Sequence, residues 1–444
     1  MRAYLRDLSE RKALRVLREP VATEFEIAAH LALADAGPAL LFENVIGHSL
    51  RVVGNLLPSR ERIALGLSTT PGALQGTLVS AIRSPLPGHW VDHAPCQEVA
   101  VERPDLGTLP IPRFFEHETG PYLTAGAIVA RNPETGGANL SYARLKPLGE
   151  NRAMIGIAPN HHLAVYARSA AARGARLPIA VTLGNHPAVA IAAALYLGLD
   201  EDEMCVAGRL FGAPVELARC AHAELGVPAH CEIVLEGTLD PAVHVAEGPV
   251  SEFHGMYESY GEGHVVEFSR LTRRGDAMLQ VIQPGYYPEH VWIGGEAIAA
   301  GLASRLARVL DNVREVAITP GGAGRMHAVI ALSAPRPGDA RDAMTAAWDM
   351  VSLVKLVTVV DDDVDPWDPV RVERAIALRM RADRDLVVMP AARTDRSDPL
   401  EDGGVVAKLG IDATRKQGDR DDWRQAEPPA SVVARIRQRS ADET

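Results

Sequence analysis

The chain has 444 residues, of which 47% are hydrophobic and 23% are charged, so it can bury a large core and fold as a globular protein of roughly two to four domains. Its formal net charge is −11 and its pI is near 5.8. This balance excludes nucleic acid as a partner, because binding a phosphate backbone needs clustered lysines and arginines.

The cysteines and the apolar segments indicate in which cellular compartment the protein lies. The N-terminus, Met1–Asp7, lacks an apolar signal core, and the most apolar run, Ala188–Leu199, is too short and too rich in alanine to cross a bilayer. We therefore expect a cytoplasmic protein without a membrane span. The cysteines form no Cys-x-x-Cys unit, which indicates reduced thiols: Cys96, Cys205, Cys220 and Cys231.

The first region, to about residue 115, mixes helix and strand patterns. A helix is predicted over Glu24–Ala34 and a strand over Leu50–Leu57. A proline cluster at Pro104, Pro110 and Pro112 marks the boundary that follows.

The central region, from Thr119 to about Gln283, is rich in predicted strands. Helices are predicted over His162–Arg173 and Pro187–Leu197. The predicted strands are Ala125–Arg131, Ala138–Leu145, Leu177–Gly184 and Val265–Arg273.

The third region alternates strands with helices, which is the pattern of an α/β layer. Helices are predicted over Glu296–Leu310 and Asp339–Val351, and a short one over Ser431–Arg439 follows a polar segment. The predicted strands are Val316–Ile318, His327–Leu332, Leu353–Val360 and Asp385–Met389. Taken alone, these patterns indicate a multi-domain protein of mixed α/β (α+β) class.

Glu247 and Glu252 stand out among the polar residues. They flank a Gly-Pro turn in the stretch Ala246–Gly255. Two carboxyl groups so placed suit acid/base chemistry if one stays ionised while the other keeps a proton.

Several further motifs occur in an order and at a spacing that resemble the UbiD family of decarboxylases, which use prenylated FMN (prFMN). They are Thr119–Tyr122, Asn139–Arg144, His161–His162, Asp202–Glu203, Pro320–Arg325, Asp361–Asp365 and Ala407–Thr414. The resemblance runs along most of the chain, so we expect the family's fold and chemistry.

The resemblance implies a three-domain layout. An N-terminal α/β domain would span residues 1–117, a flavin-reductase-like split β-barrel that holds the cofactor 118–294, and a C-terminal α/β domain 295–444. The terminal helix would contribute to a homo-oligomer, a dimer or a hexamer. A flavin prenyltransferase would supply the cofactor.

Asn139, His162 and Glu203 match the family's metal ligands, which tether the phosphate of prFMN. An amide oxygen, an imidazole nitrogen and a carboxylate suit Mn²⁺ or Mg²⁺. K⁺ is an additional candidate ion. Their spacing alone would not identify a metal site.

Other positions match the residues that contact the flavin. Ser141, Tyr142 and Ala143 lie in the matching strand with Arg144, and the resemblance implies that Lys408 reaches back to the cofactor. His161 stands where the family often has Arg or Gln.

Arg144, Glu247 and Glu252 match the family's Glu-Arg-Glu network. Arg144 presents a fork of donors that suits a carboxylate, with Glu247 as its ionised partner. Glu252, in a drier setting with a raised pKa, would donate the proton. Val250–Ser251 departs from the aromatic-glycine pair that is common before the second acid.

Two further motifs have simpler interpretations. Asp361–Asp365 is similar to an Mg²⁺-binding run but follows a strand and precedes Pro366, so a capped turn is expected. Gly321–Gly324 lacks the register of a phosphate-binding loop, and a tight turn suffices.

We expect a reversible, non-oxidative decarboxylase that takes an aromatic, heteroaromatic or α,β-unsaturated carboxylic acid and releases CO₂. Loss of CO₂ from an sp² carbon needs an electron sink that side chains do not offer, so a cofactor must supply it. Residues near His290, Trp292 and Ile293 are candidates for the substrate pocket. One alternative is a flavin-dependent oxidoreductase on the same barrel. The other is a catalytically silent scaffold, and the intact Arg144, Glu247 and Glu252 argue against this second alternative.

Overall fold

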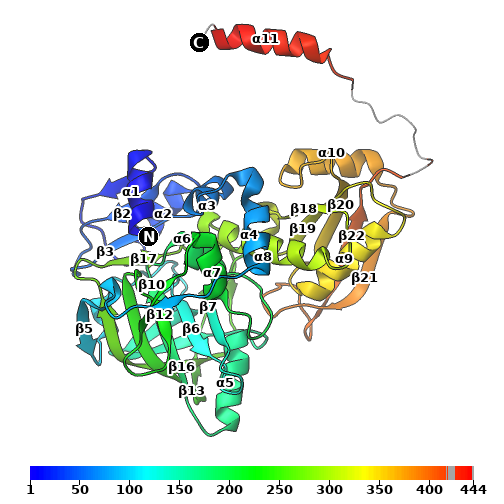
Figure 1. Cartoon of the computed structure of the whole chain (residues 1–444). Coiled ribbons are helices and arrows are strands. Elements are labelled where there is room, and N and C mark those ends of the chain that lie inside the picture. Colours follow the sequence, from blue (N-terminus) through cyan, green and yellow to red (C-terminus); the bar gives the residue numbers. More distant parts are fainter. Residues whose placement is uncertain (417, 419–425, 443–444) are drawn as a thin grey trace.

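The computed structural model describes residues 1–416, 418 and 426–442 and has three α/β regions, each with its own main sheet (Figure 1). The first region has a sheet in the order β1-β2-β3-β17, with β1 parallel to β2 and β3 parallel to β17. Its strands are β1 Leu14–Leu17, β2 Ala39–Phe42, β3 Arg51–Gly54 and β17 Met278–Val281. Its helices are α1 Arg2–Glu10, α2 Glu26–Ala34, α3 Arg60–Gly66 and α4 Leu74–Arg83.

The second region is a curved sheet of eight strands in the order β7-β6-β10-β13-β16-β9-β8, with β5 also paired to β16. The two end strands, β7 and β8, are consecutive in the chain and are separated only by Ala143. The sheet therefore bends round until its ends meet. Its strands are β5 Val99–Glu102, β6 Ala127–Arg131, β7 Ala138–Tyr142, β8 Arg144–Gly149, β9 Arg152–Gly156, β10 Leu177–Leu183, β13 Ile233–Ala246 and β16 Glu262–Arg273.

The four strands predicted for this region correspond to β6, β7, β10 and β16. The single strand expected over Ala138–Leu145 is interrupted at Ala143, where the chain passes from one end of the sheet to the other. The strands β5, β9 and β13 were not predicted. The register of β13 shifts at Gly237 and again after Asp240, and Pro241 lies within this strand. These irregularities hide the alternating pattern of a strand.

Short elements surround the curved sheet. The helices are α5 His162–Ala172, α6 Pro187–Ala192 and α7 Glu203–Phe211, and the strands are β4 His89–Trp90, β11 Glu216–Arg219, β12 Gly226–Pro228, β14 Val250–Ser251 and β15 Tyr257–Glu258. The helix expected over Pro187–Leu197 ends at Ala192. The pattern did not predict α7, whose N-cap is Asp202.

The helix α8, Pro288–Leu306, follows β17 of the first region and leads to β18 of the third. The prediction that this helix begins at Glu296 was wrong, because Gly294 and Gly295 were taken as its boundary. Proline suits the first helical position, and the glycines lie inside the helix because neighbouring groups approach it closely. A Cβ on Gly295 would lie 3.2 Å from the carbonyl oxygen of Ile318.

The third region has a five-stranded sheet in the order β18-β19-β20-β22-β21, in which β19, β20 and β22 are parallel. This confirms the α/β layer expected from the sequence. The strands are β18 Val313–Ile318, β19 His327–Leu332, β20 Leu356–Asp361, β21 Leu386–Arg393 and β22 Val405–Asp412, and the helices are α9 Asp339–Met350 and α10 Pro369–Arg379.

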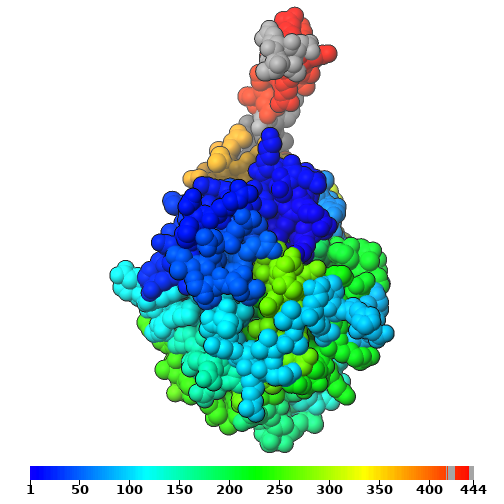
Figure 2. Space-filling view, turned by 90° about the vertical axis from the view of Figure 1, so that its left-hand side faces the viewer, coloured from blue at the N-terminus to red at the C-terminus, as the bar shows by residue number. Residues whose placement is uncertain are grey.

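The last helix, α11 Ala430–Asp442, stands away from the three regions (Figures 1 and 2). Its Val432 and Ile436 side chains are exposed. In the described part of the chain, none of the helices combines the length and apolar character that a membrane span requires.

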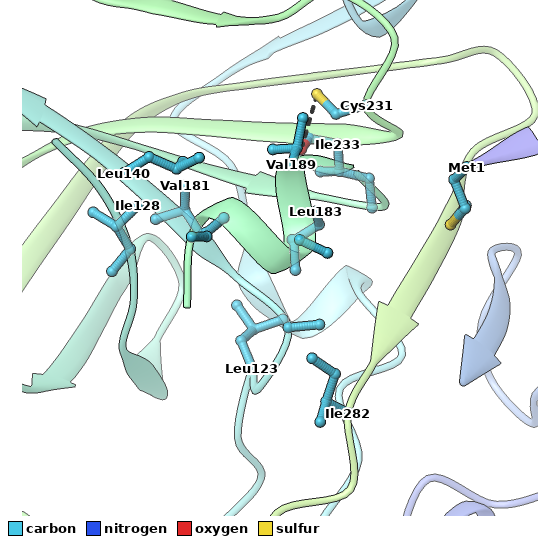
Figure 3. Close-up of a cluster of buried hydrophobic side chains, with 14 of the residues drawn as sticks. Met1, Leu123, Ile128, Leu140, Val181, Leu183, Val189, Cys231, Ile233 and Ile282 are labelled. Atoms are coloured by element: carbon cyan, nitrogen blue, oxygen red, sulfur yellow. Dashed lines mark hydrogen bonds between the residues drawn. The ribbon is translucent and has the colours of Figure 1, made fainter. Parts of the chain in front are cut away.

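The main hydrophobic core joins the first two regions (Figure 3). Val181 and Leu183 of β10 and Ile233 of β13 lie close to Val189 of α6 in this core, and all four are buried. α6 therefore packs against one side of the curved sheet. This packing fixes the position of the segment that follows α6.

Candidate active site

A cavity of about 400 Å³ lies where the curved sheet, α8 and the third region meet. This volume is in the range of small-molecule sites. Its lining comes from β7, the start of α5, the segment after α6, the start of α7 and the first turns of α8, and also includes Glu252, Phe253 and Arg325.

Arg144 and Glu247 form an ion pair beside this cavity. Arg144 Nε donates to Glu247 Oε1 at 2.5 Å and Nη2 donates to Oε2 at 3.0 Å, and the glutamate is only 1% exposed. Burial lowers the pKa of Arg144, but the bonds and charge of Glu247 outweigh burial and the net shift is upward. The pair depends on Gly156, where a Cβ would lie 2.9 Å from both Arg144 Nε and Glu247 Oε1.

Glu252 lies in the same cluster and lines the cavity. The Tyr260 hydroxyl donates to Glu252 Oε2 at 2.7 Å, and the Phe253 N–H donates to Oε1 at 3.0 Å. Arg144 Nη1 lies 4.0 Å from Glu252 Oε2. One guanidinium therefore faces both glutamates.

The expectation that Glu252 has a raised pKa was wrong. Burial raises the pKa of Glu252, but the charge of Arg144 and the hydrogen bonds from Tyr260 and Phe253 together outweigh burial, so the net shift is downward. The carboxyl group is therefore ionised at neutral pH.

The loop that carries the glutamates closes into a small hairpin, in which β14 pairs with β15. The Ser251 hydroxyl donates to Glu118 Oε1 at 2.9 Å, and Val250 is buried. Gly248 has a positive φ of 75°, and a Cβ there would lie 2.4 Å from Thr119 Cγ2. In this chain the Val250–Ser251 pair thus anchors the turn that places Glu252.

Asn139, His162 and Glu203 come together at the other side of the cavity. Asn139 Nδ2 lies 3.2 Å from Glu203 Oε1 and 3.5 Å from His162 Nδ1, and Leu140 N donates to Glu203 Oε2 at 2.8 Å. Burial raises the pKa of Glu203 to about 8. No basic side chain forms an ion pair with this carboxylate among the described residues.

These three side chains fit a divalent cation. A cation would neutralise the buried Glu203 carboxylate, and turning the Asn139 amide would present its oxygen beside the imidazole and carboxylate donors. Among the residues with described positions, no group of three His, Cys, Asp or Glu side chains is arranged for a metal. The predicted set has only two residues of those types, so its metal remains a prediction.

The other residues predicted to contact the cofactor fall into two groups. Ser141, Tyr142 and His161 line the cavity with His162. His161 also caps α5, since its Nδ1 accepts from Leu163 N at 3.2 Å, and burial lowers the pKa of His161 to about 4.

Ala143, Arg144, Glu247 and Lys408 are outside the lining. The buried Lys408 Nζ donates to the carbonyl oxygen of Ser352 at 2.7 Å, next to the lining residue Leu353. Burial lowers the pKa of Lys408 to about 8. Its contact with the cofactor stays a prediction.

The residues expected near the substrate pocket lie on different faces of α8. His290 and Ile293 line the cavity. Trp292 points to another face of the helix, where it stacks on Trp367 with ring centroids 5.7 Å apart. Helical spacing accounts for the separation.

Two residues near Glu252 were given no functional role from the sequence, although Arg325 ends the Pro320–Arg325 motif. Tyr260 bonds Glu252 across the hairpin, a contact that only the β14–β15 pairing creates. Arg325 follows the turn at Gly321–Gly324, which was expected to be only structural. That segment does form a tight turn, and it also places Arg325 in the cavity wall.

Comparisons with known proteins point to one family along most of the chain. Models of 3-octaprenyl-4-hydroxybenzoate carboxy-lyase (UbiD) match the chain with the N-terminal domain at residues 5–82, the Rift-related domain at 89–287 and the C-terminal domain at 291–413. The anhydromevalonate phosphate decarboxylase of Methanothermobacter thermautotrophicus is 34% identical over 416 residues, 93% of this chain and 96% of that protein.

Solved structures give the same result. The UbiD-class enzyme HmfF of Pelotomaculum thermopropionicum in complex with FMN has a TM-score of 0.91 at 36% identity, and the match covers 98% of this chain and 99% of that one. An evolved dimeric form of HmfF in complex with prFMN has a TM-score of 0.90 at 34% identity, with the same coverage.

Proposed function

The chain belongs to the UbiD family of carboxy-lyases, and from this premise we propose that it catalyses the reversible, non-oxidative decarboxylation of an aromatic, heteroaromatic or α,β-unsaturated acid with prFMN. The observation that carries the proposal is the placement of Arg144 against both Glu247 and Glu252 at the edge of the cavity. The curved sheet would be the flavin-reductase-like split barrel of the family.

The cofactor would be held between the metal ligands and β7. Asn139, His162 and Glu203 would bind Mn²⁺ or Mg²⁺ at its phosphate, and the other contacts would come from Ser141, Tyr142, Ala143, Arg144, His161 and Lys408. When bound, prFMN supplies the electron sink that loss of CO₂ from an sp² carbon requires.

Arg144 would hold the carboxylate of the substrate. Its Nε and Nη2 are engaged by Glu247, which leaves Nη1 and the second hydrogen of Nη2 for another acceptor. Glu247 fixes the orientation of the guanidinium and keeps it in place. The carbon–carbon bond that breaks would then be positioned by an ionic contact made before CO₂ leaves.

Glu252 would deliver the proton that replaces CO₂. Its lowered pKa means that it is ionised before substrate binds. A substrate carboxylate on Arg144 brings negative charge next to Glu252 and offsets the arginine's effect, so binding would raise the pKa of Glu252 and favour uptake of a proton. After CO₂ leaves, Glu252 would protonate the carbon that carried it, and Tyr260 would stabilise the resulting carboxylate.

The experiment that tests this function is a screen of CO₂ release with protein loaded with prFMN. The panel would contain aryl, heteroaryl and enoic acids, and anhydromevalonate phosphate belongs in it because that acid is named in the relatives' activity. Release from at least one class is expected. Flavin-dependent oxidation of NAD(P)H without release of CO₂ from any acid would instead support the oxidoreductase alternative.

A further inference from the structure

Arg325 is a half-buried cation in the wall of the cavity. It follows the turn Pro320–Gly322 and lines the cavity with Phe253, whose ring centroid lies 5.8 Å from its Cζ. Nη1 donates to the carbonyl oxygen of Gly324 at 2.8 Å. Within the described ranges, no carboxylate lies at ion-pair distance from its guanidinium, so most of its donors are left for a ligand.

Several other arginines of low exposure form ion pairs with carboxylates. Arg60 pairs with Glu296 and Glu315, Arg144 with Glu247, and Arg379 with Asp361 and Asp363. Such pairing is favourable, since a charge withdrawn from water is costly unless an opposite charge compensates it. Arg325 lacks such a partner within the described ranges and lies in the cavity wall, where a ligand could supply the opposite charge.

Gly294 of α8 leaves the space that the Arg325 guanidinium occupies, and a glycine inside a helix lowers the stability of that helix. A Cβ on Gly294, inside α8, would lie 1.7 Å from Arg325 Nη1 and 1.9 Å from its Cζ. The guanidinium therefore occupies space that only a glycine leaves. Glycine inside a helix is less favourable than alanine, so Gly294 is explained by the space that it leaves for the guanidinium.

The charge on Arg325 acts on the proton-donor side of the cavity. Burial lowers the pKa of Arg325, and the charges of Tyr196 and Glu252 oppose that effect. Glu203 of the predicted metal site is not among the groups that influence it. A guanidinium stays charged even with a lowered pKa, so it would present a cation to the part of the cavity next to Glu252.

We propose that Arg325 binds a second anionic group of the substrate, a phosphate or a carboxylate, while Arg144 binds the carboxylate that is lost. This inference rests on the proposed function and narrows its substrate class to acids with two anionic groups. Arg325 would be a substrate-binding residue whose forked donors match either oxyanion. Arg325 in the cavity wall and Arg144 beside the cavity would together fix the length and direction of the substrate.

The test compares matched acids on protein loaded with prFMN. Muconate and sorbate differ by a distal carboxylate in place of a methyl group, and 5-phosphooxypent-2-enoate and 5-hydroxypent-2-enoate differ by a distal phosphate. The variants are Arg325→Gln and Gly294→Ala, which displaces the guanidinium without removing its charge. Arg336→Gln, at an exposed arginine on the surface of the third region, is the control.

In at least one pair the wild-type protein should favour the acid with the distal anionic group by about 10- to 100-fold in kcat/KM, the range of a charged hydrogen-bonded contact. Both cavity variants should lose this preference and keep their bound flavin. The pair with the larger preference identifies the distal group as phosphate or carboxylate. An unchanged preference in Arg325→Gln would overturn the proposal, and so would loss of flavin, because Arg325 would then hold the cofactor.

A binding measurement separates failure of this inference from failure of the proposed function. Adipate and hexanoate are saturated, unreactive counterparts of muconate and sorbate, and 5-phosphooxypentanoate and 5-hydroxypentanoate are those of the second pair. Calorimetry should show tighter binding of one dianionic acid to wild type and no such difference in Arg325→Gln. If no acid releases CO₂, the proposed function fails, and calorimetry still decides the role of Arg325. Equal binding within both pairs by wild type would refute it.

Discussion

Arg144 and Glu247 form a two-point ion pair in which the glutamate is closed off from solvent and the arginine side chain stays 22% exposed. The two residues are 103 positions apart in the chain. Because the pair leaves Nη1 of Arg144 free toward Glu252, one cation can both hold a substrate carboxylate and set the charge state of the proton donor.

The first prediction concerns this pair. Arg144→Ala should lower kcat/KM by about 100-fold or more, because the substrate carboxylate loses its charged contact. It should also destabilise the protein by about 3 kcal/mol, because Glu247 is left buried without a partner. Denaturant unfolding and CO₂ release measure the two effects.

The double variant Arg144→Ala with Glu247→Gln separates stability from catalysis. It removes the unpaired charge, so much of the lost stability should return while activity stays low. Full recovery of activity in the double variant would show that Arg144 acts only through folding.

Sequence patterns predicted the α/β class, four of the eight strands of the curved sheet and the third layer. They missed β13, because its bulge and Pro241 interrupt alternation, and they misplaced the start of α8, because glycines that make room for packing look like a boundary. Local pattern alone says little about which distant segments the fold brings together.

The resemblance to a known family named the candidate site residues, and it could not give their environment. The pKa of Glu252 was expected to be raised, but it depends on how close Arg144 and Tyr260 lie. The role of Tyr260 was not predicted, because its contact with Glu252 depends on the β14–β15 hairpin. The role of Arg325 was not predicted, because its position in the cavity wall depends on the space at Gly294.

The second prediction concerns the metal. His162→Ala should lose bound divalent metal and bound flavin together, since the metal would bridge the protein to the phosphate. His186→Asn is a matched control, because His186 Nδ1 caps α6 by accepting from Ala188 N at 3.2 Å, much as His161 caps α5. Elemental analysis and flavin absorbance are the readouts. Metal bound equally well by His162→Ala would contradict the assignment.

The third prediction concerns pH. Burial lowers the pKa of His327 from 6.5 to about 4. Between these values the unfolded chain binds more protons than the folded one, so this residue makes stability fall as pH drops from 6.5 toward 4. His327→Gln, which can still bond Thr358 Oγ1, should flatten the pH dependence of the unfolding free energy over this window.

His93→Gln is the control for that measurement, because it removes an imidazole that is exposed to solvent. Its pH dependence should match that of the wild type. A slope equally steep in wild type and His327→Gln would show that His327 does not contribute to it.

The fourth prediction is a homo-oligomer, a dimer or a hexamer, with α11 contributing contacts. The apolar stripe of this helix is narrow, and Val432 and Ile436 are its exposed apolar residues, so another surface must bury most of the interface. Light scattering at micromolar concentration should give at least a dimer, and a chain ending at residue 429 should dissociate more readily. A monomeric full-length chain would refute the prediction.

The central claim is that Glu252 gives its proton to the carbon that loses CO₂, and hydrogen exchange at that carbon of the product in D₂O tests it most directly. Exchange reports protonation independently of CO₂ release. Glu252→Gln should reduce the rate of exchange by about 10²- to 10⁴-fold, which is the range of a general acid, and should leave the flavin content unchanged. Glu247→Gln should retain a higher rate of exchange. Exchange by Glu252→Gln at the wild-type rate, with loss in Glu247→Gln, would reverse the two roles.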